Sequence, residues 1–263
     1  MESMTNEAQT ELSKYKIVQK GQNKVFEVPN FLVGDFGRDA LKEYNALVKA
    51  DFKGNDALNV LSLNGNVVIG SNPYSVVLMN KVLKQTGLRA PTPAELEQIL
   101  RNGTLNLRDI YEDTALVLRT GSTPNEYLAK NLEKQVKQRG MRFSAEFPLM
   151  IPLAYLELEN DANSPSGLRF GLTENSQLIE APQLAGSEDY KKFSNTDENG
   201  LPIFDSNGNR TNYTRESGLS RLCLDRNLDL YSRYGVGNLA VSGDNGRVVL
   251  VRDAVASAPK KAK

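Results

Sequence analysis

The strongest constraint on the fold is an alternation of leucine with residues of unrelated chemistry between positions 222 and 231. Side chains at alternate positions of a β-strand point to opposite faces, so the pattern predicts a strand whose leucines are buried. A solvated strand face usually carries Lys, Glu, Thr or Gln, whereas this one mixes a thiol, carboxylates, an amide and a phenol. The inward residues are Leu222, Leu224, Leu228 and Leu230, and the outward residues are Cys223, Asp225, Asn227, Asp229 and Tyr231.

The amino-acid composition changes over the same part of the chain. Lys, Glu, Gln, Met and Trp together account for 49 of the 263 residues, yet none of them occurs from Ser217 to Pro259. About eight would be expected in these 43 residues from the composition of the whole chain. These five amino acids are the ones that no codon ending in a pyrimidine encodes.

One kind of codon accounts for both features. When the adenines of an asparagine codon are replaced at random, it yields Asn, Asp, Tyr, Ser, Cys, Arg, Gly, Val, Ala and a few others. It never yields Lys, Glu, Gln, Met or Trp. The candidate positions that carry residues of this codon set are Cys223, Asp225, Asn227, Asp229, Tyr231, Arg233, Tyr234, Gly235, Val236, Gly237, Asn238, Val241, Gly243 and Asp244.

Four segments carry apolar residues at the spacing of an amphipathic helix. The clearest of them follows Thr92, which is placed to cap a helix, with Pro93 at its first position and Glu95 completing a capping box. Thr123 and Pro124 repeat this Thr-Pro start. The predicted helices span residues 39–53, 73–85, 93–102 and 123–140.

Short apolar runs bounded by turn residues predict strands between and after these helices. Asn64-Gly65 joins two such runs into a hairpin over 58–69, and 147–159 is expected to be a buried, irregular strand. The run 247–252 is typical of a central strand, whereas the polar residues 187–217 predict a long insertion loop. Helices followed by many short strands indicate an α+β fold.

Length and charge limit the organisation and the partners. We expect an N-terminal extension over 1–20, a single domain over 21–256 and a basic disordered tail over 257–263. The start of the chain shows no apolar signal segment, and no apolar run approaches the roughly 20 residues that span a bilayer. The formal net charge is zero, which provides no long-range field for a nucleic acid.

Missing residue types exclude several kinds of chemistry. The chain has no histidine, so neither a Ser-His-Asp triad nor a zinc site with imidazole ligands can form. It has one cysteine, Cys223, and therefore no internal disulfide. We predict no cofactor and no metal, and we expect a binding protein rather than an enzyme.

Two groups of carboxylates leave other functions open. Glu157 and Glu159 lie two apart in a predicted strand and share a face, which would suit glycoside hydrolysis, although a solvated strand face is the simpler explanation. Asp205 and Glu216 bracket the oxygen-ligand spacing of a calcium loop. Arg210 stands where such a loop needs glycine, so calcium binding at 205–216 stays open.

The codon set leads to a resemblance with a known family. The C-terminal segment resembles that of the variable proteins of diversity-generating retroelements, in which adenine-specific mutagenesis rewrites residues near the chain end. The run 246–252 stands where that family has its closing core strand. The segment 88–97 is similar to the family's RLPTxAEWE helix start, with Ala90 and Leu96 as departures. The resemblance covers about 45 residues at the end of the chain and about 12 near its middle.

The resemblance implies a C-type lectin fold of the formylglycine-generating-enzyme-like subgroup, with short helices on small, mostly antiparallel sheets. It also implies a ligand-binding region at 222–246, where Tyr231 and Tyr234 anchor a protein or cell-surface ligand and Arg233 with the acids sets charge complementarity. Neither the calcium motifs of classical lectins nor the paired cysteines of formylglycine oxidation occur. A carbohydrate-active enzyme with a carboxylate pair and a viral structural or receptor-binding subunit remain the alternatives.

Overall fold

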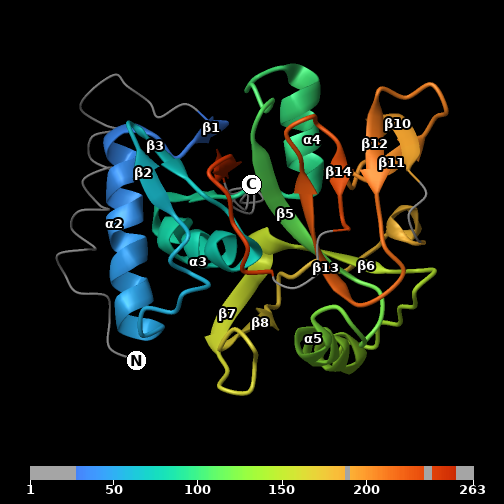
Figure 1. Cartoon of the computed structure of the whole chain (residues 1–263), viewed down its shortest axis with the longest axis horizontal. Coiled ribbons are helices and arrows are strands. Elements are labelled where there is room, and N and C mark those ends of the chain that lie inside the picture. Colours follow the sequence, from blue (N-terminus) through green and yellow to red (C-terminus); the bar gives the residue numbers. More distant parts are fainter. Residues whose placement is uncertain (1–27, 187–189, 234–238, 253–263) are drawn as a thin grey trace, which may run out of the picture.

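A nine-stranded sheet organises the molecule, and Figure 1 shows it running from the middle of the view toward the right-hand edge. The computed structural model describes residues 28–186, 190–233 and 239–252. Neighbouring strands are antiparallel except in the pairs β12–β14 and β15–β5. In spatial order the strands are β11 (Pro202–Phe204), β10 (Lys191–Thr196), β12 (Arg210–Tyr213), β14 (Leu230–Tyr231), β13 (Leu219–Leu224), β5 (Tyr111–Leu118), β6 (Leu149–Pro152) and β9 (Ile179–Glu180), with β15 (Gly246–Arg247) beside β5.

Helices and three smaller sheets surround this sheet. In Figure 1, α2 and α3 lie on the left of the molecule, while α4 lies near the top of the view and α5 near the bottom. The α-helices of the described residues are α2 (Gly34–Asp51), α3 (Pro73–Leu83), α4 (Pro93–Asn102) and α5 (Glu126–Gln138), and the short 3-10 turns are η1 (Lys84–Thr86), η2 (Leu153–Tyr155) and η3 (Pro182–Leu184). The smaller sheets are β1 (Asn30–Phe31) with β16 (Val249–Arg252) and β4 (Leu88–Arg89), β2 (Ser62–Asn64) with β3 (Val67–Ile69), and β7 (Leu156–Asn160) with β8 (Leu168–Leu172).

Local sequence signals define both ends of α4. Thr92 caps α4 as predicted, because its hydroxyl accepts from the Glu95 N–H while the Glu95 carboxylate accepts from the Thr92 N–H. Gly103 ends the helix in the left-handed conformation, at a φ of 61°. The hairpin at Asn64-Gly65 and the central position of β16 between β1 and β4 also confirm the sequence predictions.

Helix α5 begins later than predicted. Its N-cap is Asn125 rather than Thr123. Thr123 and Pro124 instead form hydrogen bonds with the chain at the start of β13. The Thr123 carbonyl accepts from the Ser217 hydroxyl, and the Pro124 carbonyl accepts from the N–H of Leu219 at 3.0 Å. A long-range contact with the start of β13 therefore overrides the local Thr-Pro signal, which sequence alone does not reveal.

The hydrophobic core has two parts, one on each face of the central strand β5. Leu116 and Leu118 belong to the part that packs against α2, α3 and α5, whereas Ala115 and Val117 belong to the part near α4. All eight residues of β5 are buried. Strand β13 lies next to β5, so the leucine side of the predicted variable strand is sealed by this core, with Leu222, Leu224 and Leu230 buried.

The prediction of a long insertion loop at 187–217 is wrong. Residues in this range form β10, β11 and β12, which extend the large sheet to its edge. The sequence hides these strands because one face of the hairpin is exposed, and Phe193 and Thr196 are the buried residues of β10. Tight turns at Asp197–Gly200 and Asp205–Gly208 account for the polar composition.

The α+β class is therefore confirmed, with helices on mostly antiparallel sheets. Residues 1–20 and 257–263, predicted as an extension and a tail, lie outside the described residues. Among the helices that the structure describes, none is both long and apolar enough to cross a bilayer.

Candidate ligand-binding face

Strand register brings two tyrosines together on one face of the large sheet, and the ring of a third tyrosine contacts them. Tyr231 of β14 is opposite Cys223 on β13 and opposite Tyr213 on β12, so these three side chains share a face. The Tyr213 and Tyr231 rings are stacked with centroids 4.1 Å apart, and the edge of Tyr190 meets Tyr213 at 5.1 Å. Tyr190 is 57% exposed. The three rings, with their hydroxyl groups, thus form an amphipathic surface on this face of the sheet.

Two arginines continue this surface. The Arg233 guanidinium donates to the Tyr190 hydroxyl at 3.1 Å. The Arg215 guanidinium donates from Nη1 to the Arg233 carbonyl at 3.2 Å and from Nε to the Ser217 carbonyl at 3.1 Å. Burial and the positive charge of Arg233 lower the pKa of Arg215. We call the surface made by Tyr190, Tyr213, Arg215, Tyr231 and Arg233 the Tyr–Arg face.

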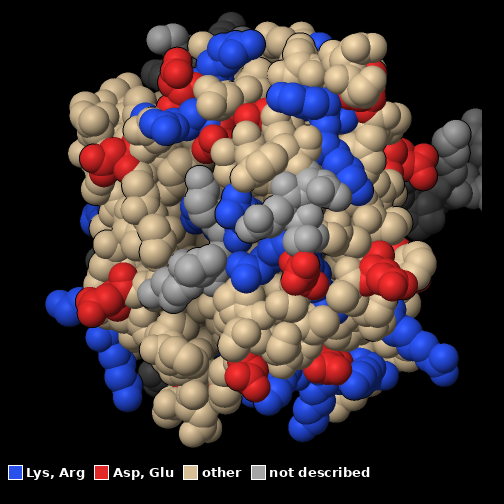
Figure 2. All heavy atoms as spheres, turned by 45° about the vertical axis from the view of Figure 1, so that its right-hand side comes forward, with Lys and Arg blue, Asp and Glu red and all other residues tan. Residues whose placement is uncertain are grey.

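Positive charges lie close to this face. Figure 2 turns the side of the molecule with β10 to β14 toward the viewer and shows Lys and Arg side chains near the middle of that view, with Asp and Glu side chains beside them. Arg119 adds a positive charge behind the face, because its side chain is 0% exposed and is bound by uncharged oxygens. Its guanidinium donates to the Leu184 carbonyl and to the hydroxyls of Ser220 and Ser232 at 2.8 to 3.0 Å. Burial is the main reason that the pKa of Arg119 falls to about 9.

The prediction that Cys223 points to solvent is wrong, because the cysteine is 1% exposed. Residues 241 and 242 contact the same part of the molecule: Arg221 of β13 donates to the Val241 carbonyl at 3.1 Å, and the Ser242 hydroxyl accepts from the Ser71 N–H at 2.9 Å. Burial raises the pKa of the Cys223 thiol, so the group stays protonated and unreactive at neutral pH.

The alternation also ends earlier than predicted, because residues 225–229 form the turn between β13 and β14. The Leu228 N–H donates to the Asp225 carbonyl at 2.7 Å, and Leu228 adopts a left-handed φ of 69°. The Asp229 carboxylate accepts from the Thr211 N–H at 2.5 Å, which ties the turn to β12. Asn227 is exposed at its tip, whereas Asp225 and Asp229 are half-buried.

The last predicted positions lie on a segment that borders the same face. Val241 is 59% exposed, and Gly243 and Asp244 are also exposed. The Tyr111 hydroxyl holds the backbone here by accepting from the Gly243 N–H at 2.7 Å. The predicted positions Tyr234, Gly235, Val236, Gly237 and Asn238 lie outside the described residues.

Two buried acidic residues of β5, Glu112 and Asp113, were not anticipated from the sequence. Asp113 accepts from the Ser71 hydroxyl at 2.8 Å and lies 3.4 Å from the Arg221 guanidinium. Glu112 accepts from the Val249 N–H at 2.9 Å. Burial raises the pKa of both carboxyls. Acidic residues inside an otherwise apolar strand, Tyr111–Leu118, were the available signal.

The other carboxylates singled out in the sequence do not converge. Glu157 is exposed, and Glu159 is paired with Arg169, whose Nε lies 2.8 Å from the Glu159 carboxylate. Asp205 caps its own turn by accepting from the Asn207 N–H at 2.9 Å, and the residues up to Glu216 continue into strand β12. Within the described ranges, no three acidic or thiol side chains gather as a metal site would require.

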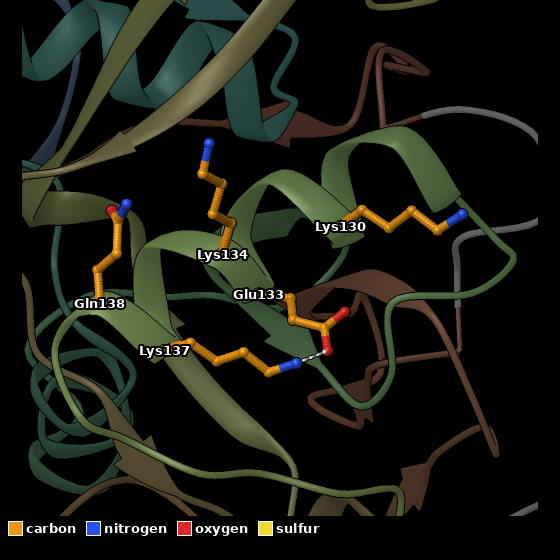
Figure 3. Close-up of a pocket in the computed structure, with 5 residues that line it drawn as sticks. All are labelled: Lys130, Glu133, Lys134, Lys137 and Gln138. Carbon is orange, nitrogen blue, oxygen red and sulfur yellow. Dashed lines mark hydrogen bonds and ion pairs between the residues drawn. The ribbon is translucent and has the colours of Figure 1, made fainter.

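A pocket occurs elsewhere, on the outer surface of α5. Figure 3 shows its lining side chains spreading from the helix, and Lys137 turns to Glu133 at 2.7 Å. The lining residues are Lys130, Glu133, Lys134, Lys137 and Gln138. Because the residues belong to one helix and do not converge on a common point, this surface provides no built binding site.

Comparison of the chain with protein-family models, with curated proteins and with solved structures found no match. The Tyr–Arg face offers aromatic rings, hydroxyl groups and cationic donors on one side of a sheet.

Proposed function

We propose that the protein binds a protein or cell-surface ligand through a C-terminal surface diversified by adenine-specific mutagenesis, on a scaffold of the C-type lectin kind. The proposed contact residues are those codon-set positions that the sheet leaves accessible. Cys223 is not among them, because it is buried. Among the described positions, Asn227, Val241, Gly243 and Asp244 are exposed, and Tyr231 and Arg233 are half-buried on the Tyr–Arg face. Asp225 and Asp229 are also half-buried, and they belong to the turn between β13 and β14.

One observation supports this proposal: over residues 230–233 buried positions alternate with half-buried codon-set positions. Tyr231 and Arg233 flank Ser232, which is buried, and Leu230 is buried beside them. A change at an outward position leaves the packing beneath it intact, so many side chains can be tried on one fold. This separation is what a diversified binding surface requires.

Comparison of the same gene in closely related genomes tests the proposal. We expect substitutions at the adenines of the codons for the accessible positions, together with a near-identical repeat and a reverse-transcriptase gene nearby. The codons of Leu222, Leu224 and Leu230 are the matched control and should not change. Substitutions spread evenly along the gene, with no repeat, would refute the proposal.

A further inference from the structure

We infer that Arg215 and Tyr213 form a constant anchor within the diversified surface, and that the anchor binds an acidic segment of a partner protein. This inference rests on the proposed function and adds the chemical class of the ligand. Two features carry it: the position of the anchor outside the codon-set stretch, and the orientation of the Arg215 side chain.

The anchor residues precede the stretch that lacks the five amino acids. That stretch begins at Ser217, whereas Tyr213 and Arg215 belong to or directly follow β12. In space they adjoin the proposed variable positions, since Tyr213 stacks on Tyr231 and Arg215 donates to the Arg233 carbonyl. Every variant would therefore present the same tyrosine and arginine beside changing neighbours.

Arg215 is held ready to accept a carboxylate. Backbone carbonyls of Ser217 and Arg233 orient its Nε and Nη1, and its Nη2 donates no hydrogen bond to any described residue. The side chain is half-buried, so little further rotamer freedom is lost when a ligand binds. Nη2 therefore keeps N–H donors for a ligand carboxylate, on a planar group that the two carbonyls hold in place.

The local charge favours the same ligand. Arg215 lies near the positive charges of Arg233 and Arg119, and no ion pair joins Arg215 to a carboxylate of the described residues. Its sequence neighbour Glu216 is exposed and makes no ion pair with it. A ligand carboxylate would relieve this repulsion. The stacked tyrosines supply the rigid apolar area that, with arginine, is enriched in protein-binding hot spots.

The test uses the full chain and a capped deca-glutamate peptide as the probe. Isothermal titration measures Kd, and 15N spectra follow the arginine Nε–Hε signals. We expect the Arg215 signal to move and R215Q to weaken binding about tenfold, while R142Q, which removes an exposed arginine on another surface, changes Kd less than about twofold. R215K keeps the charge but not the fork, so its affinity should lie between the two.

Thermal melting of each variant checks that the fold is retained. Equal Kd values for R215Q and R142Q would overturn the inference, and so would a folded chain that does not bind the peptide. Binding of a heparin oligosaccharide with the same dependence on Arg215, without peptide binding, would overturn the assignment to a protein partner. The genome comparison is independent of these results, so failure of the anchor and failure of the diversified surface can be told apart.

Discussion

The two halves of the codon-set region differ in what their residues do for the fold. In residues 223–229, the Cys223 side chain lies in the interior and the Asp229 carboxylate ties the turn to β12. In residues 231–244, the described side chains of Tyr231, Arg233 and Val241 line an open face or point to solvent. A residue type that fits a codon set therefore does not show that its position is free to vary. Burial and backbone contacts decide that.

The largest expected effect comes from placing a charge at the buried end of this region. We predict that C223D lowers the free energy of unfolding by about 3 kcal/mol or more, because the new carboxylate would be buried close to Asp113. The matched change N227D places the same group at the exposed turn and should alter stability by less than about 0.5 kcal/mol. Urea unfolding measures both. Similar values would remove the distinction between the two halves.

A smaller effect is expected at the turn. D229A removes the acceptor of the Thr211 N–H, and we predict a loss of about 1–2 kcal/mol in urea unfolding, the usual cost of an unsatisfied buried donor. D225A is the control, since the described contacts of Asp225 are made by its backbone. If D225A costs as much as D229A, the side-chain bond does not hold the turn.

The buried carboxyl of Glu112 should make the free energy of unfolding depend on pH. The pKa of Glu112 is raised well above its usual value of 4.5, so the folded state holds the proton more tightly than the unfolded state. The resulting stability is complete below pH 4.5 and is lost as the pH rises through the folded pKa. E112Q resembles the protonated form and keeps this stability. We therefore expect the free energy of unfolding of E112Q, relative to that of the natural chain, to increase from pH 4.5 to pH 8. A constant difference in urea unfolding over this range would contradict the assignment.

The smallest effects on stability are expected at the exposed residues of 231–244. V241S and D244Y change residues that are exposed, and each should alter the melting temperature only slightly, corresponding to less than about 0.5 kcal/mol. L230A, which truncates a buried leucine nearby, is the positive control and should cost about 2–5 kcal/mol. A large loss in V241S would show that this segment is part of the core.

Elements governed by neighbouring residues were predictable. The capping box at Thr92 and the hairpin at Asn64-Gly65 depend on contacts within a few positions, and both occur as expected. Strands 191–196 and 202–204 were missed because an exposed edge hairpin carries few apolar residues, so its periodicity is weak. The start of α5 was missed because Thr123 and Pro124 are engaged by a strand almost a hundred residues later.

The Tyr–Arg face was also predictable only in part. Sequence alone determined the parity of the leucines and the codon set, since both depend only on the order of residues. Only the tertiary structure decided which of these residues reach the surface: Cys223 is buried within the sheet, and β12 brings Tyr213 beside Tyr231. The physical reason is that burial depends on every segment packed against a strand, and strands paired across a sheet need not be close in sequence.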